Sequence, residues 1–160
     1  MNVLFVCTEN VARSRAAETL FHRLQGQTGR HEVRSVGTAS HAARRLTTRD
    51  LVWADVIAVM EPRHLDVVRR HWPHHAVKVV VLDVFDLFLP EELELREALE
   101  AKVGMLLERC DTVAAGGLVS VRDAGLSSLA GRRAPLSVDA PVGAQVRDHC
   151  EISKNGGQRS

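Results

Sequence analysis

The sequence lacks a long hydrophobic run and a large net charge. No apolar stretch approaches the ~20 residues that a helix needs to cross a bilayer. The N-terminus has no basic segment before a long apolar core and no small-residue cleavage site, so we do not expect a signal peptide. The formal net charge is +1, which gives no strong field to attract nucleic acid or a membrane surface. We therefore expect neither nucleic acid nor a membrane as a partner.

The sequence also lacks paired cysteines. Its three cysteines are Cys7, Cys110 and Cys150, an odd number without a CxxC pair. This pattern excludes a disulfide framework and a cysteine-pair metal site, and it predicts a reducing, cytoplasmic location. The pairs Arg69-Arg70 and His74-His75 are interpreted as a solvated helix end and loop, because a metal site needs further ligands at suitable spacing. We expect no metal site.

Strand-like and helix-like patterns alternate over the first part of the chain. Buried strands are expected at residues 2–6, 31–36, 56–60 and 77–82. Helices are expected at residues 14–24, with Ser14 as the cap, at 47–53, at 62–71 and from Pro90 onward. The last helix carries Leu95, Leu99, Val103 and Leu106 on one face. This alternation predicts an α/β fold, a four-stranded parallel sheet with helices on both faces.

The composition changes after about residue 112. Gly, Ala, Ser and scattered Arg dominate from there, without a sustained period, and the chain ends in SKNGGQRS. We therefore expect one domain over residues 1–112 and a disordered or loosely packed tail over residues 113–160.

The stretch CTENVARS, residues 7–14, lies between the first expected strand and the first expected helix. In an open parallel sheet such a turn binds ligands, and its backbone N–H groups and the helix N-terminus form an anion cradle. Arg13 can bind two phosphate oxygens, and the electropositive surroundings favour a thiolate at Cys7. Ser14 could donate its hydroxyl proton to the sulfur.

Cys7 could instead be a small core residue, but its spacing to Arg13 and Ser14 favours a nucleophile beneath a bound phosphate. The expected phosphate-binding residues are Thr8, Glu9, Asn10, Val11, Ala12, Arg13 and Ser14.

Several motifs in order resemble one family. V-C-x-x-N-x-x-R-S-x-x-A-E, residues 6–18, resembles the signature of the low-molecular-weight protein tyrosine phosphatases. SVGT at residues 35–38 resembles the S-A-G-T after that family's second strand, and residues 41–61 resemble its H-x-A-R and M-[DE] stretch. LDVFDL at residues 82–87 resembles the D-I-P-D-P that carries its general acid. The resemblance covers residues 3 to about 110. It implies the three-layer, flavodoxin-like fold of the phosphotyrosine protein phosphatase I type, in a compact variant with a short loop.

The resemblance implies a role for each matching residue. Cys7 is the nucleophile that forms a phosphocysteine, and Arg13 binds the phosphate. Asp86 protonates the leaving phenolate and then activates water. A hydrogen-bond network that holds the loop is implied for Asn10, Ser14, Ser35 and His41. The implied activity is cofactor-independent hydrolysis of a phosphorylated protein or a small aryl phosphate.

Departures from the family pattern leave alternatives open. Leu87 stands where the family has proline, so Asp83 competes with Asp86 as the acid, although an Asp at a strand end often turns the chain. His41 is nearly as well interpreted as an ordinary exposed histidine. The absence of tyrosine excludes regulation by phosphorylation of loop tyrosines.

Two other functions compete with the phosphatase. An arsenate reductase on this scaffold needs resolving thiols, and Cys110 and Cys150 are far apart in sequence. A phosphate- or phosphoprotein-binding module without turnover would need the cradle and Arg13 but no reactive thiol.

Overall fold

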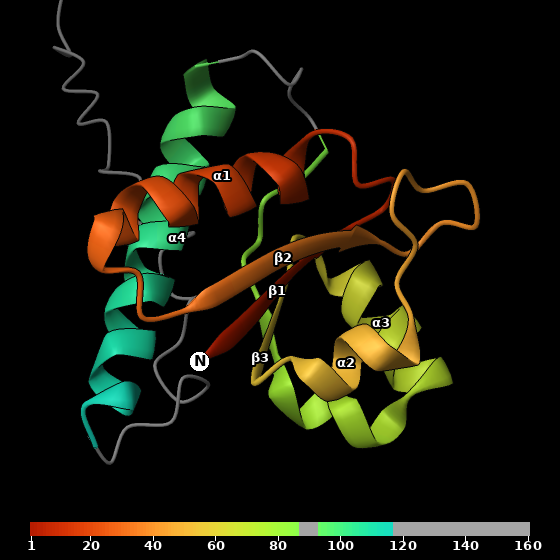
Figure 1. The fold of residues 1–160 in the computed structure, drawn as a ribbon. Helices are drawn as coiled ribbons and strands as arrows, with labels where there is room; N and C mark the ends of the chain where they lie inside the picture. Colours follow the sequence, from red (N-terminus) through yellow and green to blue (C-terminus); the bar gives the residue numbers. More distant parts are fainter. Residues whose placement is uncertain (87–92, 117–160) are drawn as a thin grey trace, which may run out of the picture.

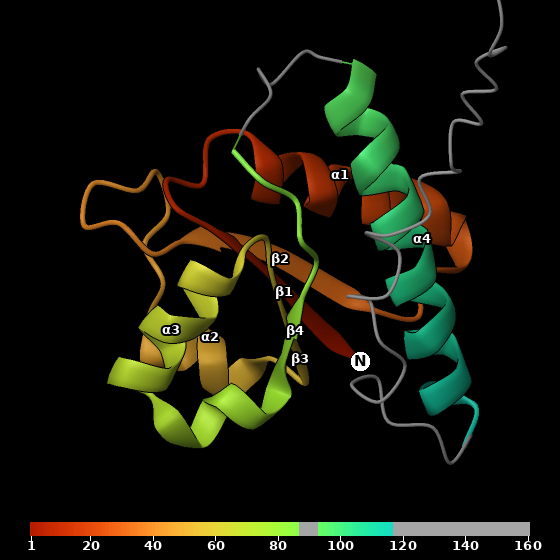
Figure 2. The same cartoon turned by 180° about the vertical axis from the view of Figure 1, so that it is seen from behind.

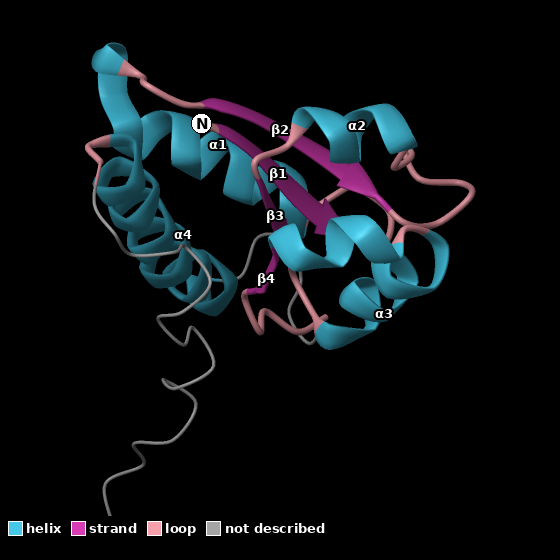
Figure 3. Cartoon of the chain, turned by 90° about the horizontal axis from the view of Figure 1, so that it is seen from below, coloured by secondary structure: helices cyan, strands magenta, loops and turns pink. Residues whose placement is uncertain are grey.

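The computed structural model describes residues 1–86 and 93–116. Its four strands form one parallel sheet in the order β2-β1-β3-β4 (Figure 1). The strands are β1 (Asn2–Cys7), β2 (Glu32–Gly37), β3 (Val56–Val59) and β4 (Val79–Val81). Helices α1 (Arg13–Gln25) and α4 (Leu93–Ala114) cover one face, and α2 (Thr48–Trp53) and α3 (Pro62–His71) cover the other (Figure 3). The three layers confirm the predicted α/β fold class.

The alternation of side chains along β1 builds a core on each face of the sheet. Phe5 packs edge-on against Phe21 of α1, with ring centroids 5.9 Å apart. Leu4 points to the opposite layer, where Leu51 of α2 is fully buried. The predicted apolar face of the last helix is confirmed, because its four apolar residues pack in the same cluster as Phe5: Leu95, Leu99, Val103 and Leu106.

Two predicted boundaries are wrong. Ser14 is not the cap of α1, which begins at Arg13 and has no side-chain cap hydrogen bond, because the Ser14 hydroxyl is turned toward Cys7 instead. The strand expected at residues 77–82 shrinks to Val79–Val81. A 3-10 helix, Pro73–Lys78, takes its first residues, and the Lys78 Nζ donates to the Ala54 carbonyl at 2.8 Å.

The residues that the structure describes include the predicted domain boundary but little of the predicted tail. The boundary at residue 112 falls near the end of α4, which continues to Ala114. The expected helix start at Pro90 and the tail from residue 117 lie outside the described residues. None of the helices in the described ranges has the length and apolarity that crossing a membrane requires.

The strand order determines where a ligand can bind. The chain passes from β1 to β2 on one side and reaches β3 on the other side of β1. The carboxyl ends of β1 and β3 therefore form the switch point where open α/β sheets bind ligands. The segments that follow β1, β3 and β4 meet at this edge (Figure 2).

Candidate active site

The loop after β1 closes around the sulfur of Cys7. Asn10 has a φ of 56°, a left-handed conformation that Asn adopts more readily than most residues. The turn brings the Asn10 backbone N–H to 3.1 Å from Cys7 Sγ. The end of β2 supports the loop from outside, because Thr38 N–H donates to the Cys7 carbonyl at 2.9 Å. At Gly37 a Cβ would lie 2.6 Å from the Thr8 carbonyl oxygen, so a glycine is needed for this close approach.

Hydrogen bonds branch from the Asn10 side chain, and one branch leads through Ser14 to the sulfur. The side-chain amide of Asn10 donates to Ser14 Oγ at 3.0 Å and to Ser35 Oγ at 2.9 Å. Ser35 in turn donates to Glu18 Oε2 at 2.5 Å. Because Ser14 Oγ accepts from Asn10, its own proton is available to Cys7 Sγ, which lies 2.9 Å away. The network therefore presents a hydroxyl donor to the Cys7 sulfur.

Arg13 is buried beside the loop, where three acceptors contact its guanidinium group. Its Nη1 donates to the Glu61 carboxylate and, at 3.1 Å, to the Val84 carbonyl. Its Nη2 lies 3.0 Å from Asp86 Oδ2. Burial alone would raise the pKa of the Glu61 carboxyl, but hydrogen bonds from Arg13 and Arg63 outweigh it and hold that pKa below its usual value. Arg13 is thus fixed as a cation with a charged partner on each side.

These groups line one cavity of about 290 Å³. Its walls are Cys7, Thr8, Glu9, Val11, Ala12, Arg13, Arg63 and Asp86. A larger hollow, about 500 Å³, lies between the C-terminal parts of α1 and α4 and has no cysteine among its lining residues. The cavity over Cys7 is therefore the candidate active site, because it combines a thiol with fixed positive charge.

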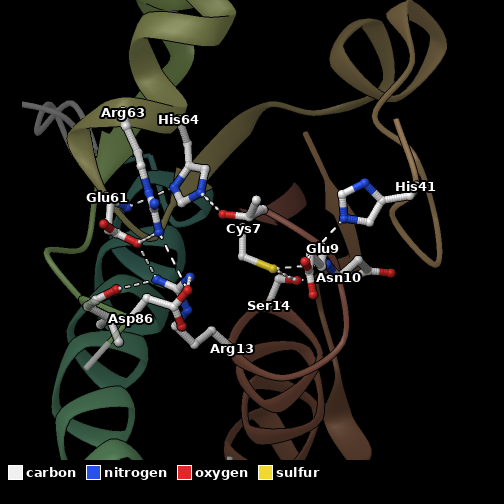
Figure 4. A network of polar contacts seen from close by, with 12 residues as sticks. Cys7, Glu9, Asn10, Arg13, Ser14, His41, Glu61, Arg63, His64 and Asp86 are labelled. Carbon is white, nitrogen blue, oxygen red and sulfur yellow. Dashed lines mark hydrogen bonds and ion pairs between the residues drawn. The ribbon is translucent and has the colours of Figure 1, made fainter. Parts of the chain in front are cut away.

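The structure brings most of the expected site residues together. Asp86 lines the cavity and contacts Arg13, whereas Asp83 is not among the lining residues. His41 does not join the buried network around Asn10. It is an exposed residue whose Nε2 lies 3.1 Å from the Glu9 carboxylate, on the outside of the loop (Figure 4).

The first turn of α3 carries functional residues that no sequence motif indicated. Glu61, Arg63 and His64 project from it toward the loop that carries Cys7 (Figure 4). Glu61 holds Arg13, Arg63 lies 3.6 Å from Asp86 Oδ2, and His64 Nε2 lies 3.0 Å from Thr8 Oγ1. The signal that could have found them is positional, since this turn follows β3 at the switch point.

Within residues 1–86 and 93–116, no group of three or more His, Cys, Asp or Glu side chains is placed to hold a metal ion.

Comparisons with known proteins agree with this geometry. A family model described as low molecular weight phosphotyrosine protein phosphatase matches residues 2–49. A search of curated proteins found no match. Solved structures with the same fold include the YwlE arginine phosphatase from Geobacillus stearothermophilus, 24% identical with a TM-score of 0.59 over 74% of this chain and 98% of that chain. The tyrosine phosphatase Wzb from Escherichia coli K30 is also 24% identical, with a TM-score of 0.55 over 67% and 96%.

A third structure has a higher sequence identity. The low molecular weight protein tyrosine phosphatase from T. tengcongensis is 26% identical, with a TM-score of 0.56 over 68% of this chain and 98% of that chain. The matched residues 2–49 contain β1, the whole loop over Cys7 and the end of β2 that supports it. Over these residues the chain is similar to the low molecular weight phosphotyrosine protein phosphatases, and the solved structure from T. tengcongensis shares its fold.

Proposed function

We propose that the chain is a cysteine-dependent phosphatase that hydrolyses phosphotyrosine or another aryl phosphate monoester through a phosphocysteine. The observation that carries the proposal is the position of Cys7 Sγ in the cavity. It accepts from the Asn10 N–H at 3.1 Å, lies 2.9 Å from the Ser14 hydroxyl, and shares the cavity with Arg13. An anion-binding loop with a thiolate at its base is suited to attack on phosphorus.

The reaction proceeds in two steps. The Cys7 thiolate attacks phosphorus, the bond to the phenolic oxygen breaks, and Asp86 gives its proton to that oxygen. Asp86 then accepts a proton from water, the water oxygen attacks the phosphocysteine, and inorganic phosphate leaves as the thiolate is restored. Arg13 and the loop N–H groups stabilise the negative charge on the phosphoryl oxygens in both steps.

Asp86 has two positions in this scheme. In the free protein its carboxylate contacts Arg13 Nη2 at 3.0 Å, so an incoming phosphate competes for the same donor. When it leaves Arg13, Asp86 takes up from solvent the proton that it gives to the leaving oxygen. Arg63 lies 3.6 Å from the same carboxylate oxygen and can hold Asp86 at the rim when the phosphate displaces it. The acid then lies beside the leaving group rather than on the phosphate.

The rim of the cavity favours an aryl substrate. Val11 lines the cavity and is 61% exposed. An exposed apolar side chain in the wall of a charged cavity can pack against an aromatic ring. Because one structural neighbour is named an arginine phosphatase, a phosphoarginine substrate belongs in the same assay.

The arsenate reductase alternative is disfavoured by Cys110. It is fully buried in the core, and burial raises the pKa of its thiol to about 11. A thiol so placed is unsuited to attack an adduct on Cys7. Cys150 lies outside the described residues.

The test is hydrolysis of p-nitrophenyl phosphate, a phosphotyrosine peptide and phosphoarginine by the purified full chain. Cys7→Ser should abolish turnover, and Asp86→Asn should lower kcat by about 10² to 10⁴, the usual contribution of a general acid. Asp83→Asn, the matched control, should stay near the wild-type rate. A damaging Asp83→Asn would transfer the acid role to Asp83. Phosphate binding without turnover of any substrate would support the binding-module alternative.

A further inference from the structure

We propose that the Thr8 hydroxyl donates a hydrogen bond to a phosphoryl oxygen in the cavity, and that the buried His64 is the positioning residue that turns its proton there. The inference rests on the proposed function only in taking a phosphate group as the occupant of the cavity. It adds a donor from β1's loop and a supporting histidine from α3 to the phosphate site.

The hydrogen bonds of His64 determine which ring nitrogen carries its proton. Its side chain is buried, with 1% exposure, and Nδ1 lies 3.1 Å from the backbone nitrogen of Glu61. A backbone N–H only donates, so Nδ1 must be the unprotonated acceptor. The proton of the neutral ring is therefore on Nε2, which lies 3.0 Å from Thr8 Oγ1 and donates to it.

Burial keeps the His64 ring neutral. Burial lowers the pKa of His64 to about 4, and the nearby cations Arg13 and Arg63 add to that lowering, whereas the Glu61 carboxylate opposes it. Near neutral pH the ring thus has one donor and one acceptor, each already paired. His64 cannot serve as an acceptor for the Thr8 proton.

The Thr8 hydroxyl consequently has a proton to give. A hydroxyl has one proton and accepts through its lone pairs, one of which is used by His64. His64 is its side-chain partner within the described residues. Thr8 also lines the cavity that contains Cys7 and Arg13. An ionised phosphate oxygen bound there is a hydrogen-bond acceptor. It can therefore accept the proton of the Thr8 hydroxyl.

Glu61 couples this hydroxyl to Arg13. Its backbone N–H fixes the His64 ring, and its carboxylate binds Arg13. The first turn of α3 therefore orients two donors to the same anion, one cationic and one neutral. This explains why a histidine with no solvent contact faces a phosphate loop at all.

The test measures binding and turnover separately. Inorganic phosphate should protect Cys7 from alkylation by iodoacetamide. Mass spectrometry of the peptide that contains Cys7 measures the alkylated fraction, and its dependence on phosphate concentration gives the Kd of phosphate. Thr8→Val, which keeps the shape and removes the hydroxyl, should raise that Kd about tenfold to a hundredfold, the effect of losing a hydrogen bond to a charged group. The same variant should lower kcat/KM for p-nitrophenyl phosphate by a similar factor. Thr8→Ser should stay near wild type.

His64 is tested through its dependence on Thr8. His64→Leu should weaken phosphate binding in the wild-type background but have no further effect beside Thr8→Val, because it acts through that hydroxyl. His64→Gln should retain most of the binding, since its side-chain amide can accept from the Glu61 N–H and donate to Thr8. Melting temperatures check that each variant folds, and Thr19→Val, an exposed threonine of α1, is the matched control.

The outcomes separate the two proposals. Unchanged phosphate affinity in Thr8→Val, or losses from Thr8→Val and His64→Leu that simply add, would overturn this inference and leave the phosphatase intact. If phosphate protects Cys7 and the protection depends on Thr8, but the protein turns over no substrate, the Thr8 contact is supported and the phosphatase function is rejected. No protection of wild-type Cys7 by phosphate would contradict both.

Discussion

The neutral state of His64 makes the stability of the fold depend on pH in a way that one substitution should remove. Its pKa is lowered from the usual 6.5 to about 4 in the folded chain, first by burial. Between these values the unfolded chain binds a proton on this ring and the folded chain does not. Stability is therefore lost as the pH falls from about 6.5 to about 4.

The size of the effect follows from the two values. The difference between 6.5 and about 4 corresponds to about 3 kcal/mol of unfolding free energy at most. Urea unfolding from pH 7.5 to 4.5 should show wild type losing stability relative to His64→Gln, with a difference slope approaching about 1.4 kcal/mol per pH unit. The pairing of Glu61 also favours stability at higher pH, but both proteins share it.

A matched control isolates the buried ring. His74→Gln makes the same replacement at an exposed histidine, and it is measured beside wild type and His64→Gln over the same pH range. If the difference between wild type and His64→Gln does not change with pH, His64 is not held neutral and the reasoning about its proton is refuted.

Three further substitutions test other parts of the account. Gly37→Ala should destabilise the fold by about 1–3 kcal/mol and lower turnover, measured by urea unfolding and p-nitrophenyl phosphate hydrolysis, because its Cβ would meet the Thr8 carbonyl at 2.6 Å. Phe21→Ala should cost about 3–5 kcal/mol of unfolding free energy, since this ring is fully buried against Phe5; a loss under 1 kcal/mol would contradict that packing. Ser14→Ala should slow alkylation of Cys7 by iodoacetamide at neutral pH, because it removes the hydroxyl donor at 2.9 Å from the sulfur; an unchanged rate would show that the hydroxyl does not stabilise the thiolate.

Local patterns were sufficient to predict the fold class and the loop. The alternation of apolar strands with helical faces predicted the parallel sheet, and CTENVARS lies at the carboxyl end of β1 and the start of α1 as expected. The start of β4 could not be predicted in this way, because Val77 and Lys78 have strand-like neighbours but lie in a 3-10 helix. There the pattern VKVVVL could not reveal the tertiary contact of Lys78 with the Ala54 carbonyl.

Long-range partners of the site could not be predicted in this way. His64 is 56 residues from Thr8, and Glu61 is 48 residues from Arg13. Neither spacing carries a local signal, and only the packing of α3 against the switch point brings them together. Ser14 shows the opposite problem, because a serine before a helix looks like a cap, and only its buried environment shows that it serves the sulfur.

The central claim is that Cys7 carries the phosphoryl group, and an acid quench during turnover of p-nitrophenyl phosphate tests it most directly. Peptide mass spectrometry should find one phosphoryl group on Cys7 in wild type and more of it in Asp86→Asn, where water is poorly activated. Turnover that persists in Cys7→Ser, with no phosphoryl group found on Cys7 in the other two proteins, would contradict the account.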